Sequence, residues 1–161
     1  MKDWVQRKLN DVISDDVQAK MKEKMAESGV TVPISASMLM RIFQKQMTKQ
    51  DQIQQFSISF QDSYIHVNGI IKKFLVRIPF SIVLEPLEAK ERTLLFKIHE
   101  MKPLNQNWIN YRIFHKPPVT TYEEKQIHIN LNEIDKVKVI PVGKIKQFSI
   151  QDEKLRVKIG L

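Results

Sequence analysis

Large hydrophobic side chains occupy every second position of residues 74–84, whose sequence is FLVRIPFSIVL. Alternation with a period of two is typical of a β-strand that lays one face on a hydrophobic core. At the usual rise per residue, this strand would be roughly 36 Å long. Pro79 has no backbone N–H, which indicates a sheet edge, a bulge or a bend near the middle of the strand. The side chains predicted to face the core are Phe74, Val76, Ile78, Phe80, Ile82 and Leu84.

Similar alternation recurs after residue 52 and predicts a long antiparallel sheet. Turns are expected at residues 61–63 and 86–90. The string Gln-Phe-Ser-Ile leads to Gln-Asp both near residue 61 and near residue 151, so each copy is interpreted as a hairpin that turns there. Hydrophobic residues change parity near Lys146 and Gln147, which requires a bulge or bend. The other predicted strands cover residues 56–60, 65–71, 94–98, 127–131, 136–146, 147–151 and 155–159.

Helical periodicity dominates the beginning of the chain. Residues 1–27 repeat hydrophobic side chains every four positions, and the drift of that repeat predicts a break at residues 14–16. A third helix is expected to begin at Ser35 or Ser37 as N-cap. Residues 103–118 fit either a short helix or a strand, and the helix is favoured because two prolines end the segment. The hydrophobic stripe of the third helix consists of Leu39, Ile42, Phe43 and Met47.

These elements predict an α+β fold in which the N-terminal helices pack in the concave face of a long, strongly curved antiparallel sheet. The chain of 161 residues is expected to form one domain over residues 1–161. Both the sheet and the helices present too many large hydrophobic side chains to be left in water. The sheet could wrap around a helix and leave a groove for an apolar ligand, or it could close into a dry core. The pattern leaves both open.

Composition narrows the function classes. The chain has no cysteine, so disulfides and thiolate metal sites are excluded. No hydrophobic run approaches the length of a membrane span. The N-terminus lacks the hydrophobic core of a signal peptide, which predicts a cytoplasmic protein, peripheral to the membrane at most, unless a leader has been removed.

The formal net charge is +8, and much of the excess lies in residues 136–161. Such an excess favours a polyanionic partner, although a solvated lysine-rich face is an equally plain interpretation. Nucleic acid binding is disfavoured, since the predicted strands do not interleave exposed aromatic residues for base stacking. Anionic phosphates in general remain candidates. The cations expected to form a ladder on the outward face are Lys136, Lys138, Lys144, Lys146, Arg156 and Lys158.

Motifs of enzymes are missing from the sequence. The four histidines are scattered without metal-ligand spacing, and the four glycines are isolated, so no phosphate-binding loop is formed. The nucleophile elbow of hydrolases is also missing. We therefore expect a non-enzymatic binding protein with no catalytic residues, no metal and no cofactor.

Three stretches resemble the LmeA-like phospholipid-binding family and are similar to the YpmS-like proteins of Gram-positive bacteria: PISASMLMRIFQKQM, FSISFQDSYIHVNGIIKKFLVRIPFSIVLEP and INLNEIDKVKVIPVGKIKQFSIQDEKLRVKIGL. The resemblance covers roughly residues 30–161. It implies a fold related to tubular lipid-binding domains and a non-enzymatic lipid-binding function. The residues that would line an apolar tunnel are Leu39, Ile42, Phe43, Met47, Phe74, Val76, Ile78, Phe80 and Ile82.

The leading hypothesis is a protein that binds a phospholipid or another apolar ligand at or near an anionic membrane surface, where the cations contact head groups. The second is an interaction or scaffold domain with a closed core, which could form a homo-oligomer through its N-terminal helix. The third is nucleic acid binding through the basic C-terminal strands. The sequence leaves the identity of the ligand open.

Overall fold

The computed structural model describes residues 29–103 and 107–161. The two helices predicted within residues 1–27, and their packing against the sheet, lie outside the described residues. The described part is mostly antiparallel sheet with a few short helices, which agrees with the predicted α+β class.

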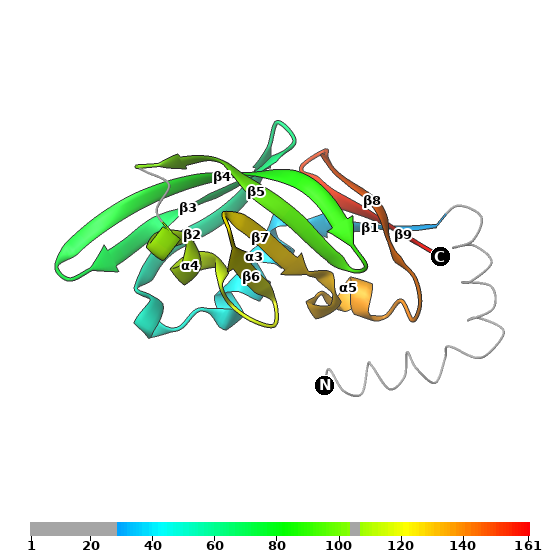
Figure 1. Cartoon of the computed structure of the whole chain (residues 1–161), viewed down its shortest axis with the longest axis horizontal. Coiled ribbons are helices and arrows are strands. Elements are labelled where there is room, and N and C mark those ends of the chain that lie inside the picture. The colour runs from blue at the N-terminus through cyan, green and yellow to red at the C-terminus, as the bar shows by residue number, and fades with distance from the viewer. Residues whose placement is uncertain (1–28, 104–106) are drawn as a thin grey trace.

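A six-stranded antiparallel sheet with the order β2-β3-β4-β5-β7-β6 forms the larger layer. It is strongly curved, and Figure 1 shows helices α3 and α4 on its concave side. Strand β4 is the longest strand of the described chain and pairs with both β3 and β5. The strands of this sheet are β2 (Ile53–Gln61), β3 (Tyr64–Lys73), β4 (Val76–Lys90), β5 (Thr93–Lys102), β6 (Thr120–Glu123) and β7 (Gln126–Asn130).

A three-stranded sheet with the order β1-β9-β8 adjoins the larger one. It places β1 (Val30–Ser35) beside the C-terminal hairpin of β8 (Lys144–Gln151) and β9 (Lys154–Gly160). Val32 opposes Val157 and Ile34 opposes Leu155, all four of them buried, so the sheet turns one face to the core. The beginning and the end of the described chain are thus joined in one layer.

The helical elements are short. Helix α3 (Ala36–Gln46) is capped by Ser35, whose hydroxyl accepts a hydrogen bond from the Met38 N–H at 3.3 Å. Helix α4 (Asn107–Phe114) precedes β6. The remaining helical turns are η1 (Lys49–Asp51), η2 (Leu131–Glu133) and α5 (Asp135–Lys138). Both the capped third helix and the helix within residues 103–118 are therefore confirmed.

One hydrophobic cluster extends through both sheets and the helices. Phe43 of α3 belongs to it, and its ring centroid lies 5.8 Å from that of Phe56 and 6.4 Å from that of Phe114. Gly69 pairs with Phe80 across the β3–β4 ladder, and a Cβ at Gly69 would lie 2.7 Å from the Phe80 ring. Only glycine leaves room for this ring to lie over the strand.

The local turn chemistry was largely predictable. The β2–β3 hairpin turns at Asp62 and Ser63, and the β8–β9 hairpin at Asp152 and Glu153, which confirms both hairpins of the repeated string. The pairing register of β8 shifts between Ile145 and Gln147, as the change of parity predicted. In Figure 1 these two hairpins lie side by side at the top of the molecule.

Three strand predictions are wrong in part. No turn interrupts residues 86–90, because β4 accommodates Pro86 by a shift of register next to it and continues to Lys90. Residues 136–146 do not form one strand, because Val137 and Ile140 follow helical spacing and both are buried. The long strand begins at Val76 rather than at residue 74. The ladder from β4 to β5 starts only at Ser81, so Pro79 lies at an edge position, as its missing N–H indicated.

Candidate functional site

Five hairpins of the described chain have loops of two residues, and one of these loops differs from the rest. The loops at residues 62–63, 91–92, 124–125 and 152–153 consist of polar or charged side chains. The loop between β3 and β4 consists of Phe74 and Leu75. Tight turns favour glycine, asparagine and aspartate, whose side chains suit the backbone there. The chemistry of a turn therefore does not explain this pair.

The side chains of the β3–β4 loop extend into solvent. Phe74 is 89% exposed, Leu75 is 96% exposed and the adjoining Val76 is 58% exposed. Phe74 also has a φ of 59°, a left-handed conformation that costs a residue with a side chain roughly 1–2 kcal/mol. In Figure 1 the two strands extend together to the left end of the molecule and carry this loop with them. We call residues 72–77 the β3–β4 tip.

Cations surround the hydrophobic apex of the tip. Lys72 and Arg77 are direct partners across the two strands, and Lys73 pairs with Val76. Since side chains alternate between the two faces of a hairpin, Lys73 lies on one face while Lys72 and Arg77 lie on the other. Residues 63–84 contain no aspartate or glutamate. Like charges directly opposite each other destabilise a strand pair, so this arrangement opposes folding unless an anion binds there.

Helix α4 supports the base of the tip. The guanidinium of Arg112 donates a hydrogen bond to the Lys72 carbonyl at 3.4 Å. The half-buried Trp108 ring receives the Lys73 ammonium at 4.3 Å and the Arg112 guanidinium at 5.4 Å from its centroid. A cation over an aromatic face is stabilised by the ring quadrupole. Trp108 therefore holds two cations of the same sign close together.

A hollow of about 370 Å³ lies between the tip and α4. Among the described residues, its lining combines three basic residues with two glutamines and one phenylalanine, and it includes no acid. We call it the basic hollow. The lining residues are Gln50, Gln52, Lys72, Lys73, Phe74 and Arg112.

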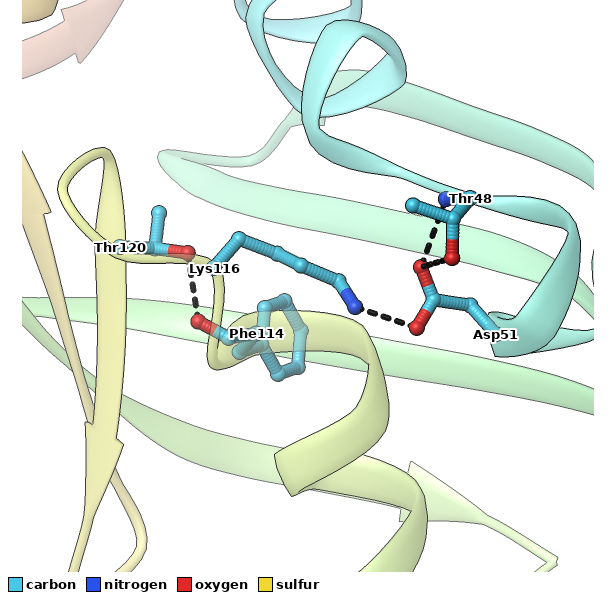
Figure 2. A network of polar contacts seen from close by, with 5 residues as sticks. All are labelled: Thr48, Asp51, Phe114, Lys116 and Thr120. Atoms are coloured by element: carbon cyan, nitrogen blue, oxygen red, sulfur yellow. Dashed lines mark hydrogen bonds and ion pairs between the residues drawn. The ribbon is translucent and has the colours of Figure 1, made fainter.

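An ion pair anchors α4 to the segment after α3. The Lys116 ammonium lies 2.6 Å from the Asp51 carboxylate, and both side chains are largely buried. Figure 2 shows Lys116 extending from the loop after α4 toward Asp51, whose other oxygen accepts the Thr48 N–H at 2.8 Å. At the two ends of the same loop, the hydroxyl of Thr120, the first residue of β6, donates to the carbonyl of Phe114, the last residue of α4. These contacts hold the end of α4 in place.

The pKa of Asp51 reflects two opposing effects. Burial of the carboxyl group raises its pKa, but the hydrogen bonds from Lys116 and Thr48 together with the charge of Lys116 outweigh burial. The pKa of Asp51 is therefore lowered below its usual value of 3.8. The carboxylate stays ionised at neutral pH and keeps its partner.

The opposite end of β4 is built in another way. Arg92, in the β4–β5 loop, donates hydrogen bonds to the carbonyls of Gly143 at 3.0 Å, Val137 at 3.1 Å and Ile140 at 2.8 Å. The Ile145 N–H donates in turn to the Glu91 carbonyl at 2.7 Å. Burial lowers the pKa of Arg92, although an arginine remains charged in proteins. This loop organises the segment that enters β8.

The side chains predicted to line an apolar tunnel separate into two groups. Most lie inside the hydrophobic cluster, with Leu39, Phe43, Phe80 and Ile82 almost fully buried and Ile42, Met47 and Ile78 partly so. Phe74 and Val76 lie at the exposed tip instead. Their prediction as core residues is wrong, because the alternation of β4 continues in sequence through a turn that the backbone makes at residue 74.

The predicted cations do not form one ladder on a single strand. Lys136 and Lys138 are exposed on α5, whereas Lys144 and Lys146 are exposed on β8. Arg156 and Lys158 share a face of β9, and Arg156 lies 3.5 Å from Asp152. A continuous ladder was predicted because residues 136–146 were interpreted as a strand.

Sequence reasoning missed the cations of the tip. Lys72, Lys73 and Arg77 flank the string Phe-Leu-Val, and a run of three hydrophobic residues between basic ones was the signal available. This run was interpreted instead as part of the alternation of the long strand. Arg112 gives no such signal, since it comes next to the tip only through the fold.

Comparison of the chain with protein-family models, with curated proteins and with solved structures finds no match. The resemblance to the LmeA-like and YpmS-like proteins therefore stays a prediction. Within residues 29–103 and 107–161, no three metal-ligating side chains are grouped so that they could hold an ion. In the same part of the chain, no helix is long and apolar enough to cross a membrane.

Proposed function

We propose that this protein is a non-enzymatic lipid-binding protein that attaches to anionic membrane surfaces through the β3–β4 tip. One observation carries the proposal: the tip exposes Phe74, Leu75 and Val76 next to three cations. Stable attachment to a membrane surface generally needs two signals, a hydrophobic one and a basic one. The tip combines both within six residues.

The side chains of the tip would contribute several kcal/mol to membrane attachment. Full burial of a Phe, Leu or Val side chain contributes about 1.5–3 kcal/mol. Each basic residue near an anionic surface contributes about 1 kcal/mol. Arg77 lies two residues beyond Leu75, roughly 7 Å along the strand. A peripheral segment buries its apolar part about 5–10 Å deep, so an inserted tip would place Arg77 at the level of the phosphates.

The packing of the core also favours surface attachment. Phe43, predicted to line a tunnel, contacts Phe56 and Phe114 instead of an open space. The hydrophobic side chains left exposed at the tip are those that a bilayer would cover.

Vesicle co-sedimentation tests the proposal. The full chain is mixed with phosphatidylcholine vesicles, with or without phosphatidylglycerol, and compared with a Phe74→Asn/Leu75→Gly double variant. Leu87→Asn removes another exposed hydrophobic side chain, which lies outside the tip, and serves as the matched control. We expect the native chain and the control to bind anionic vesicles, and the double variant to bind at least ten-fold more weakly.

Two results would contradict the proposal: a native chain that binds neither vesicle type, or a double variant that binds as well as the native chain. Light scattering of the same samples adds a further distinction. If the native chain binds no vesicles but self-associates, and the double variant does not self-associate, the tip would be a contact with a second copy of the chain instead.

A further inference from the structure

We infer that the basic hollow binds the phosphate of a lipid phosphomonoester head group, such as that of phosphatidic acid. This inference rests on the proposed function, since it assigns a head group to the same attachment site. Lys72, Lys73 and Arg112 line the hollow, and no acidic side chain does. Lys73 and Arg112 lie close together at Trp108, and neither has a partner of opposite sign among the described lining residues.

Two of these cations are held in place before any ligand binds. Arg112 donates to the Lys72 carbonyl at 3.4 Å, and Trp108 lies within cation–π distance of both Arg112 and Lys73. Arginine presents several N–H donors in a rigid plane, a geometry that suits phosphate oxygens. Gln50 and Gln52 also line the hollow, and a glutamine amide can donate to a phosphate oxygen.

The positive charge of the basic hollow favours one class of phosphate ester over another. A phosphomonoester carries a charge of about −1.5 to −2 at neutral pH, whereas a phosphodiester carries a single negative charge. The charges of Lys73 and Arg112, which Trp108 holds close together, are better balanced by the monoester. The hollow has a volume of about 370 Å³, near the lower end of the range for small-molecule pockets.

The position of the hollow selects a lipid rather than a free phosphate. Phe74 belongs both to its lining and to the apex of the tip. A lipid whose phosphate occupies the hollow would place its acyl chains beside Phe74, so the hydrophobic and the charged contacts act on one molecule.

The experiment compares vesicles that contain phosphatidic acid with vesicles that contain phosphatidylglycerol, matched for surface potential. Arg112→Gln removes a cation of the hollow. Arg77→Gln is the matched control, because it removes a cation of the tip that does not line the hollow. Urea denaturation verifies that both variants are folded.

We expect the native chain to bind phosphatidic acid vesicles several-fold more tightly. Arg112→Gln should lose about five-fold in affinity for them and little for phosphatidylglycerol, because one basic contact is worth about that factor. Arg77→Gln should weaken binding to both lipids equally. Equal binding of the native chain to both lipids would overturn the head-group assignment and leave the attachment site standing. An Arg112→Gln variant that weakens binding to both lipids equally, as expected for Arg77→Gln, would also overturn the head-group assignment and leave the attachment site standing.

Competition with sn-glycerol 3-phosphate separates the two sources of the phosphate. At a concentration equal to that of the accessible lipid, we expect it to leave the protein on phosphatidic acid vesicles. Complete displacement would assign the hollow to a soluble phosphate and overturn the lipid assignment. Failure of the native chain to bind any anionic vesicle would overturn the proposed function itself.

Discussion

The two ends of strand β4 carry hairpin loops of equal length and opposite chemistry. At one end, Phe74 and Leu75 extend into solvent at the far end of the curved sheet. At the other end, Glu91 and Arg92 are joined to the segment before β8 through several hydrogen bonds. A charged residue thus serves the fold at one end, and hydrophobic residues are left outside it at the other.

The difference separates stability from function. Burying Arg92 is compensated because its guanidinium meets the carbonyls of Val137, Ile140 and Gly143. Phe74 adopts a left-handed conformation while 89% of its side chain stays exposed, so burial in the described part of the chain does not compensate for it. Local rules are broken most often at functional sites. The β3–β4 tip fits that expectation, whereas the β4–β5 loop belongs to the framework.

The largest expected effect tests the framework end. Arg92→Ala should lower the free energy of unfolding by about 3 kcal/mol, since it leaves three partly buried carbonyls without their charged donor. Urea denaturation followed by circular dichroism measures the change.

Arg77→Ala is the matched control at the tip end. Its guanidinium has one hydrogen bond, to the exposed Gln54 side chain at 3.2 Å, so we expect a change within about 0.5 kcal/mol. Equal losses in the two arginine variants would contradict the distinction between the two ends.

An intermediate effect is expected beneath the tip, at the ion pair of Asp51 and Lys116. Asp51→Asn should lower the free energy of unfolding at pH 7 by about 1–2 kcal/mol, between the values for exposed and buried pairs. Because the folded-state pKa of Asp51 is lowered, its contribution is complete above the unfolded value of 3.8 and disappears as the pH falls through the lower folded value.

The native chain and Asp51→Asn should therefore approach each other in stability as the pH falls below about 4. Denaturation curves at pH 7 and pH 3 measure the gap. A gap that stays constant over this range would show that the charge of Asp51 does not contribute.

The smallest expected effect concerns the stability of the tip. Replacement of Phe74 and Leu75 by Asn and Gly should leave the free energy of unfolding unchanged or raise it by up to about 1 kcal/mol, because Asn tolerates a positive φ. Thermal denaturation beside the vesicle assay measures this. A loss of stability as large as that of Arg92→Ala would mean that the tip serves the fold, and the comparison of the two ends would fail.

Predictions of the features that depend on neighbouring residues were confirmed. Ser35 as the cap of α3 and the turns at Asp62 and Asp152 depend on neighbouring residues only, and each is confirmed. The α+β class with a curved antiparallel sheet follows in the same way from alternation over many residues. The failure at Phe74 has a physical cause: Phe74 has the same even parity as the core positions of β4, so alternation alone does not show that the loop at residues 74 and 75 lies outside the strand.

Other features depend on contacts between distant parts of the chain. Residues 136–146 have hydrophobic positions that fit a strand, yet the carbonyls of Val137 and Ile140 are held in a helical turn and loop by Arg92, more than forty positions earlier. Similarly, Arg112 lies far from Lys72 in sequence and meets it only because α4 packs beneath the sheet. No local pattern encodes such pairs.

The sequence alone determined the antiparallel sheet, most of its turns, the capped helix and an excess of positive charge, because each follows from side chains close together in the chain. The tertiary structure decided which hydrophobic residues the core would take in and which it would leave outside. Phe43 and Phe80 are buried where the sheet curves around α3, whereas Phe74 is exposed because the paired strands extend beyond the other elements of the described chain. The same geometry brings Arg112 to the tip and forms the basic hollow.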